Sequence, residues 1–242
     1  MIASFSNNFI FIKTRKTAGT SIEIVLSAWC SGRDICTPIS DADEALRATY
    51  GAVPRNHSRG LLGRLLGRRD FYNHMPATDV RAALPSLWSS AFTFAVDRHP
   101  YEKVVSLAYF ELGRRHGADR LGDELLSERI SAVIAEKRYL NFPLYTEKNS
   151  VIVDELVPYA AAWKHVEDLA RRIGREIPAE LPRAKTQFRR DRRPAEVILT
   201  EGHMRQIRKD AAAEFDLFAW SEHSTAAAQG GTETSMRRFR SC

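Results

Sequence analysis

A short apolar run followed at once by a basic, hydroxyl-rich turn is the sequence feature that most constrains this chain. Residues 9–12 read Phe-Ile-Phe-Ile, and residues 13–21 read Lys-Thr-Arg-Lys-Thr-Ala-Gly-Thr-Ser. An apolar stripe at helical spacing follows, formed by Ile22, Val25, Leu26 and Trp29. This order predicts a strand, a tight loop and a helix that runs from about Thr20 to Ala28. Such a junction directs backbone N–H groups and a helix N-terminus at an anion.

The turn differs from the Walker A loop of nucleotide triphosphatases. That pattern, G-x-x-x-x-G-K-S/T, places its lysine directly after a second glycine. Here Lys16 precedes Gly19, the only glycine of the turn, by three positions. The turn is therefore predicted to be an anion site of another kind, in which side chains add donors to the backbone groups. These side chains are Lys16, Thr17, Thr20 and Ser21.

A second junction of the same kind follows residues 91–96, a short β-prone apolar run. Arg98 lies just beyond that run, and ligands bind at the carboxyl ends of strands in open parallel sheets. Ser106 lies on the helical pattern that begins at Pro100. A guanidinium and a hydroxyl in this arrangement suit a terminal phosphate. Each residue also has a purely structural interpretation. Arg98 could form an ion pair with a neighbouring acid, and the Ser106 hydroxyl could bond the backbone of its own helix.

The remaining pattern alternates helices with short strands. Strands are expected at 71–75 and 151–153, and helices at 41–50, 79–84, 124–137 and 159–173, with a last one capped by Thr200. This alternation predicts an α/β domain with a central parallel sheet flanked by helices, arranged as a P-loop-like three-layer sandwich. From residue 223 the chain turns to Ser, Thr, Ala and Gly without periodicity. Residues 223–242 are therefore expected to be a disordered tail.

Charge and cysteine content narrow the class of ligand and the compartment. The formal net charge of +6 favours anionic ligands, without separating nucleic acid, nucleotides, acidic glycans and membrane surfaces. Three cysteines without C-x-x-C spacing favour reduced thiols in a reducing compartment. No signal peptide and no membrane span is expected, because no apolar run is long enough. The basic, leucine-striped segment 54–69 is either a mobile cover over an anionic ligand or a membrane-surface helix, and its three glycines favour the first.

Together the two junctions resemble the sulfotransferases that use 3′-phosphoadenosine 5′-phosphosulfate (PAPS), in particular the carbohydrate and Golgi-type branch and its bacterial relatives. The family's 5′-phosphosulfate loop, commonly P-K-T-A-G-T-S, is matched by Lys16, Thr17, Ala18, Gly19, Thr20 and Ser21. Arg15 stands where proline is usual. Arg98, Pro100 and Ser106 are similar to the 3′-phosphate motif R-x-P-x-x-R-x-x-S, with Lys103 in place of the internal arginine. The resemblance implies a sulfotransferase domain over residues 1–222.

The resemblance implies an in-line transfer of a sulfuryl group from PAPS to a hydroxyl, with 3′,5′-ADP as the leaving group. Lys16 is expected at the leaving oxygens, and Thr20 and Ser21 at the 5′-phosphate. His74 is the candidate base, because a histidine near its usual pKa suits proton abstraction at neutral pH. The alternatives are His57 as the base and a His74 with no catalytic role.

Three further expectations concern ligands. Lys185 and Thr186, in the basic stretch 183–193, either close over the 3′-phosphate of PAPS or belong to a solvated charge run. No metal is expected, since the histidines lack metal-like spacing with acids or cysteines. The acceptor is expected to be a glycan hydroxyl, on an acidic glycan if segment 54–69 contributes to its recognition. Because the Golgi relatives carry an anchor and this chain shows none, the resemblance favours a cytoplasmic enzyme of the bacterial type.

Two other functions remain open at this point. A P-loop kinase or NTPase would also place phosphates on the first loop, but its lysine spacing and its Walker B acid are not evident. A nucleic-acid-binding module would use the basic runs at 59–69 and 183–193, yet no RRM, helix-turn-helix or zinc signature accompanies them. The sulfotransferase interpretation predicts no nucleic-acid partner.

Overall fold

A mixed β-sheet forms the centre of the computed structural model, which describes residues 1–58, 60–65, 70–117, 122–184, 188–189, 191–220 and 236–237. Its strands follow the order β3-β1-β2-β4-β7-β8. β2, β4 and β7 are parallel to one another, whereas β1, β3 and β8 join antiparallel at the edges. The strands are β1 (Ile2–Ser4), β2 (Phe9–Ile12), β3 (Ile35–Cys36), β4 (Phe92–Asp97), β7 (Glu155–Pro158) and β8 (Met236–Arg237). The expected α/β class is confirmed, and the parallel arrangement holds for the central strands only.

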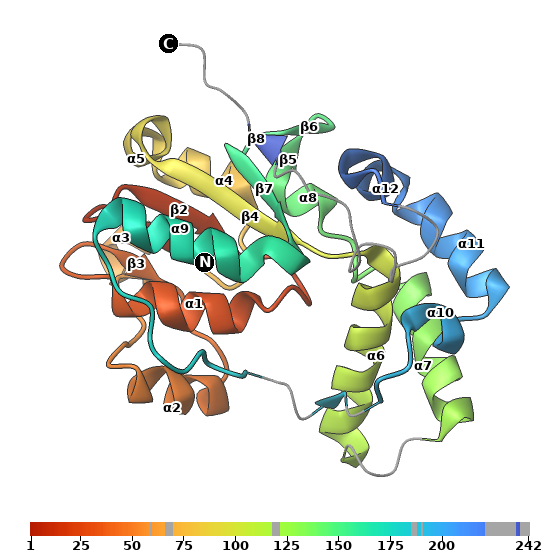
Figure 1. Cartoon of the computed structure of the whole chain (residues 1–242). Helices are drawn as coiled ribbons and strands as arrows, with labels where there is room; N and C mark the ends of the chain where they lie inside the picture. Colours follow the sequence, from red (N-terminus) through yellow and green to blue (C-terminus); the bar gives the residue numbers. More distant parts are fainter. Residues whose placement is uncertain are drawn as a thin grey trace.

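Helices cover both faces of the sheet (Figure 1). One face packs against α1 (Gly19–Ala28) and α9 (Ala162–Ile173), and the other against α4 (Ala77–Ala83) and α5 (Pro85–Ser90). Successive side chains of a strand point to opposite faces, so a strand covered on both sides must be apolar throughout. This explains the unbroken apolar run of β2, whose four residues are all buried.

A separate helical core lies beside the sheet, at the right of Figure 1. It is formed by α6 (Pro100–His116), α7 (Asp123–Ala135), α10 (Ala195–Ile198), α11 (Glu201–Asp210) and α12 (Ala212–Phe218). Pro100 occupies the first turn of α6, and the Thr200 hydroxyl accepts the His203 N–H at the start of α11, as predicted. The other elements are α2 (Asp41–Thr49), α3 (Gly60–Leu65), α8 (Phe142–Tyr145), η1 (Tyr159–Ala161), β5 (Thr146–Glu147) and β6 (Ser150–Val151).

Several predicted boundaries are wrong for local reasons. Residues 71–75 form no strand; Phe71 and Met75 enter the core from a turn. Of the strand expected at 151–153, Val151 belongs to the short strand β6, and the sheet strand β7 begins at Glu155, directly after Asp154 bonds Thr93. The helix expected at 79–84 is α4, Ala77–Ala83, and Pro85 begins the next helix, α5, where its missing N–H costs nothing. Strands β1 and β3 are too short to give a pattern.

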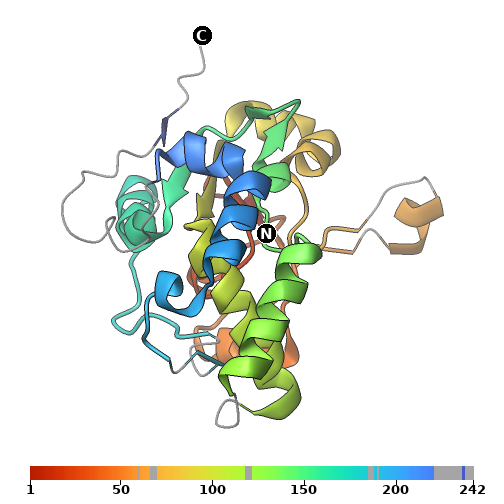
Figure 2. The ribbon, with the colours of Figure 1, turned by 90° about the vertical axis from the view of Figure 1, so that its right-hand side faces the viewer.

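Of the segment 54–69, the structure describes residues 54–58 and 60–65. Its helix α3, orange in Figure 2, projects from the body, and Leu61 and Leu65 are 78% and 76% exposed. Among the described residues, no helix combines the length and the apolar character needed to cross a bilayer. Apart from Met236 and Arg237, the predicted tail at 223–242 lies outside the part of the chain that the structure describes.

Candidate active site

The two predicted junctions open into one cavity of about 1490 Å³. Because β2 and β4 are parallel, their carboxyl ends reach the same edge of the sheet and bring both following loops together. The wall includes residues 13–21 of the β2–α1 loop, together with Arg98 and Ser106 from the β4–α6 junction. The segment 179–184 forms another part of the wall. Positively charged side chains dominate the lining: Lys13, Arg15, Lys16, Arg98, Arg138, Arg183, Arg189 and Arg192.

The β2–α1 loop is held in an unusual backbone conformation. Lys16 and Ala18 have φ angles of 61° and 56°, in the left-handed region that side chains rarely adopt. Gly19 begins α1, and a Cβ at this position would lie 2.9 Å from the Cγ atom of Lys13. The glycine is therefore required by close approach of the loop to the Lys13 side chain.

Lys13 holds the loop in place through a buried cluster of ion pairs. Its Nζ atom lies 2.5 Å from an oxygen of Glu23, whose other oxygen lies 2.9 Å from the N-terminal ammonium. Burial by itself would raise the pKa of Glu23, but the charge of Lys13 and of the N-terminal ammonium outweighs it and lowers the pKa to about 2. The charge of Lys13 is thus compensated inside the protein.

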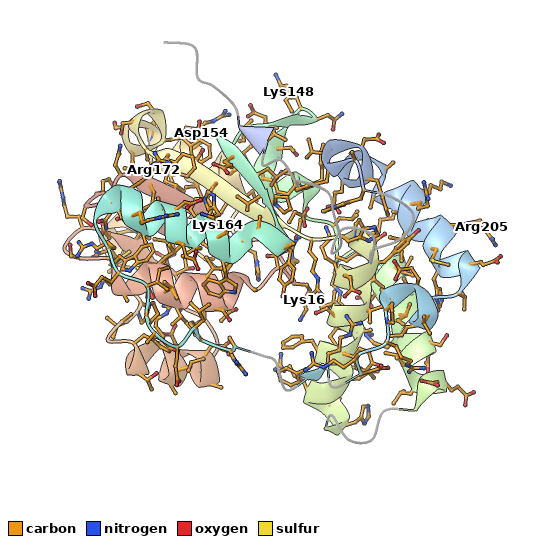
Figure 3. All side chains as sticks on the ribbon, viewed as in Figure 1. Lys16, Lys148, Asp154, Lys164, Arg172 and Arg205 are labelled. Atoms are coloured by element: carbon orange, nitrogen blue, oxygen red, sulfur yellow. The ribbon has the colours of Figure 1, made fainter. Side chains whose placement is uncertain are left out.

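Lys16 extends across the cavity from the loop to α6 (Figure 3). Its Nζ atom lies 4.2 Å from the ring centroid of Phe110, a cation–π distance. Phe110 lies one turn after Ser106 on the same face of α6. Lys16 therefore joins the two phosphate-suited junctions in space.

The hydroxyl residues of the loop divide into two groups. The Thr17 side chain is fully buried and shares a hydrogen bond of 2.8 Å with Thr14, so it stabilises the loop itself. Thr20 and Ser21, in the first turn of α1, line the cavity. The Ser21 hydroxyl also accepts the Ala184 N–H at 3.2 Å, which ties the segment 179–184 to the start of α1.

Arg98 lies at the cavity wall and also forms one of the ion pairs that the sequence left open. Its guanidinium lies 2.7 Å from Glu102 and 4.5 Å from the ring centroid of Tyr159. Glu102 also binds Arg189, at 2.6 Å. With Asp97, Arg98 forms only a backbone hydrogen bond of 2.8 Å. One carboxylate therefore holds two cavity-lining arginines in place.

Lys103 does not supply charge to the cavity. Its side chain is 0% exposed and lies 3.0 Å from Asp97 and 2.5 Å from Glu214, which are equally buried. Burial would lower the pKa of Lys103, but the two carboxylates raise it above its ordinary value. Lys103 stands at the position of the motif's internal arginine, but a buried lysine between two acids is a structural group.

His74 lies in the cavity wall, on a turn where its φ angle is 59°. Its Nδ1 atom lies 3.1 Å from the carbonyl oxygen of Lys13. A carbonyl oxygen only accepts, so Nδ1 carries the proton and Nε2 carries the lone pair. Burial and then the charge of Lys13 lower the pKa of His74 to about 3, in contrast to the ordinary value that the sequence suggested.

This depressed pKa makes a prediction about stability. Below pH 6.5 the unfolded chain protonates His74, whereas the folded protein resists protonation until about pH 3. Acidification from pH 6.5 to pH 4 will therefore lower the free energy of unfolding of the wild type more than that of His74→Gln. Urea unfolding at several pH values measures the difference. His116→Gln, which replaces an exposed histidine at the end of α6, is the control and should follow the wild type. Equal slopes for the wild type and His74→Gln contradict the prediction.

Several side chains of the site carried no readable signal in the sequence. Tyr159, Trp163 and Arg138 line the cavity but belong to ordinary helical or turn patterns, and only the fold brings them to the strand ends. Lys185 and Thr186 lie outside the described residues, although their neighbours Arg183 and Ala184 line the cavity. Within the described ranges, no group of three or more His, Cys, Asp or Glu side chains is placed to hold a metal ion.

Comparisons with protein-family models, with curated proteins and with solved structures find no match to this chain.

Proposed function

We propose that this protein is a PAPS-dependent sulfotransferase that acts on a hydroxyl group of a carbohydrate. The observation that carries the proposal is the meeting of two anion-suited strand–loop–helix junctions at one basic cavity. A ligand with two separated anionic ends matches this arrangement better than a ligand with one. The proposal includes a P-loop-like sandwich for residues 1–222. It also includes a cytoplasmic location, which the buried free thiols Cys30 and Cys36 support.

The donor is proposed to lie across the cavity between the two junctions. The backbone N–H groups of the β2–α1 loop, with Thr20 and Ser21, would hold the 5′-phosphosulfate at the start of α1. Arg98 and Ser106 would hold the 3′-phosphate, with Lys185 and Thr186 closing over it. Tyr159 and Trp163 offer aromatic faces in the same wall for the adenine base.

The reaction is an in-line displacement at sulfur. The acceptor oxygen forms a bond to sulfur while the bond from sulfur to the bridging oxygen breaks, and 3′,5′-ADP leaves with that electron pair. Lys16 neutralises the charge that develops on the bridging oxygen. Nε2 of His74 accepts the hydroxyl proton, and the anionic donor beside the ring would raise the pKa of His74 from the low value that burial and Lys13 give it.

A kinase or NTPase is disfavoured by the acid at the end of β4. Asp97 holds the position next to the loop strand where a Walker B acid would bind magnesium. Its carboxylate is fully buried and accepts hydrogen bonds from Lys103, Asn141 and Tyr145 at 3.0, 2.8 and 2.7 Å. These bonds occupy the oxygens that a metal ion would need.

Calorimetric titration with 3′,5′-ADP tests the proposal. The wild type is expected to bind 3′,5′-ADP without magnesium, and Arg98→Ala to bind it at least about tenfold more weakly, since a charge-assisted bond contributes about 1.5–3 kcal/mol. Arg205→Ala is the control, because Arg205 lies on the outer side of α11, away from the cavity (Figure 3). Binding of ATP only with magnesium, or of oligonucleotides alone, would contradict the proposed function.

A further inference from the structure

Arg15 is held at the cavity wall by its backbone. Asn141, which is fully buried, accepts the Arg15 N–H at 2.9 Å and donates to the Arg15 carbonyl at 3.0 Å. Asn141 is itself fixed, because its backbone N–H donates to Glu214 at 2.6 Å. A proline at position 15, usual in the loop that this chain resembles, has no N–H to donate to Asn141. Arg15 is thus a residue whose position is determined before any ligand binds.

The guanidinium of Arg15 is partly buried without a matching acid. It donates to the carbonyl oxygen of Leu140 at 3.4 Å, and among the described residues no carboxylate pairs with it. Burial and then the nearby charge of Arg138 lower the pKa of Arg15. Two guanidiniums line one wall, and that of Arg15 has no carboxylate partner among the described residues; an oxyanion would stabilise this arrangement.

Arg138 contributes the second guanidinium from the turn that also contains Leu140. It lies 2.5 Å from Glu111 and also pairs with Glu136, so these two carboxylates fix the orientation of its guanidinium. Arg138 lines the same cavity as Arg15 and His74. The charge of Arg15 also contributes to the lowered pKa of His74, so Arg15 acts electrostatically on the candidate base.

We propose that Arg15 and Arg138 form an acceptor subsite, which binds an acidic group, carboxylate or sulfate, of the glycan whose hydroxyl faces His74. The inference rests on the proposed function and adds the class of acceptor: an acidic glycan. The donor has other partners in the same cavity, namely Lys16, the start of α1, and Arg98 with Ser106. The acidic acceptor that the basic segment 54–69 suggested is thus assigned to a different part of the chain, since the described residues of that segment do not line the cavity.

Three hexasaccharide probes show whether a carboxylate or a sulfate is the group that the subsite binds. The first contains glucuronate and no sulfate, the second is its carboxyl-reduced neutral form, and the third is the reduced form bearing O-sulfate groups. Each is titrated into protein with and without 3′,5′-ADP. The wild type is expected to bind at least one acidic probe about tenfold more tightly than the neutral probe. Arg15→Met and Arg138→Gln are expected to lose that preference, while their affinity for 3′,5′-ADP stays within about twofold of the wild-type value.

Arg205→Met is the matched control for a general loss of positive charge, and it should keep the preference. Equal binding of all three probes by the wild type, or no binding of any, would overturn the subsite. So would the same loss of preference in Arg205→Met. A tenfold loss of 3′,5′-ADP affinity in Arg15→Met would assign Arg15 to the donor instead. Failure of the wild type to bind 3′,5′-ADP would refute the proposed donor, while the probes titrated alone would still report on Arg15 and Arg138.

Discussion

Replacing Lys16 by alanine is expected to lower kcat by about 10²–10³, the loss typical of removing one group that stabilises developing negative charge. Lys16 is the cation that extends from the β2–α1 loop across the cavity to Phe110 on α6. Lys13 cannot replace it, because the charge of Lys13 is compensated by Glu23. The measurement is a steady-state assay with labelled PAPS and an acceptor found by screening. Binding of 3′,5′-ADP should weaken much less than kcat falls, since the charge on the bridging oxygen is greatest in the transition state.

Lys148→Ala is the matched control for this variant. Lys148 also has a positive φ angle, 48°, but lies in the turn between β5 and β6, far from the cavity (Figure 3). Any effect of placing alanine in a left-handed conformation is therefore present in both variants. Lys148→Ala should retain wild-type kcat. A Lys16→Ala protein that is folded and retains more than about a tenth of kcat would contradict the role given to Lys16.

Replacing Lys103 by methionine is expected to lower the free energy of unfolding by about 3–5 kcal/mol, the usual effect of removing one partner of a buried charge pair. The variant leaves Asp97 and Glu214 buried and without their shared cation. Urea unfolding followed by circular dichroism measures the change. Because Lys103 does not line the cavity, folded Lys103→Met should bind 3′,5′-ADP within a few-fold of the wild type.

Two further variants identify the cause of that loss. Lys137→Met removes a lysine that pairs with Asp210 at 2.8 Å but is 55% exposed, and it should cost less than about 1 kcal/mol. Adding Glu214→Gln to Lys103→Met should restore part of the stability, because one unpaired buried carboxylate is neutralised. If Lys103→Met lowers the free energy of unfolding only slightly, or if the double variant lowers it further, the buried network of Asp97, Lys103 and Glu214 is contradicted.

The sequence predicts well those features that depend on neighbouring residues. The β2–α1 junction follows from one apolar run, one glycine and one helical stripe, all within residues 9–29. The start of α6 at Pro100 and the cap at Thr200 are local as well. The β4–α6 junction shares the cavity with the first loop because both strands are parallel and adjacent, which strand and helix alternation already favours.

Features that depend on distant partners were not predictable. Lys103 has the charge that a motif position requires, but Glu214 lies 111 residues away and determines that the lysine is buried. The pKa of His74 depends on the desolvation and the charge that surround it in the fold, neither of which the sequence states. The sequence shows that Arg15 departs from the usual proline, but not that its N–H donates to Asn141, because the two residues lie 126 positions apart.

The contacts of Asn141 determine when the backbone of the β2–α1 loop is fixed during folding. The β2–α1 loop precedes α12 by nearly the whole described chain, but its backbone is bonded by Asn141, and Asn141 is bonded by Glu214 on α12. A chain in which α12 has not docked therefore lacks the Glu214 contact that fixes Asn141. Part of the hydrogen bonding that holds the β2–α1 loop is in place only after a helix about 190 residues further along the chain has packed against it, so this loop is completed late in folding although its own sequence is local.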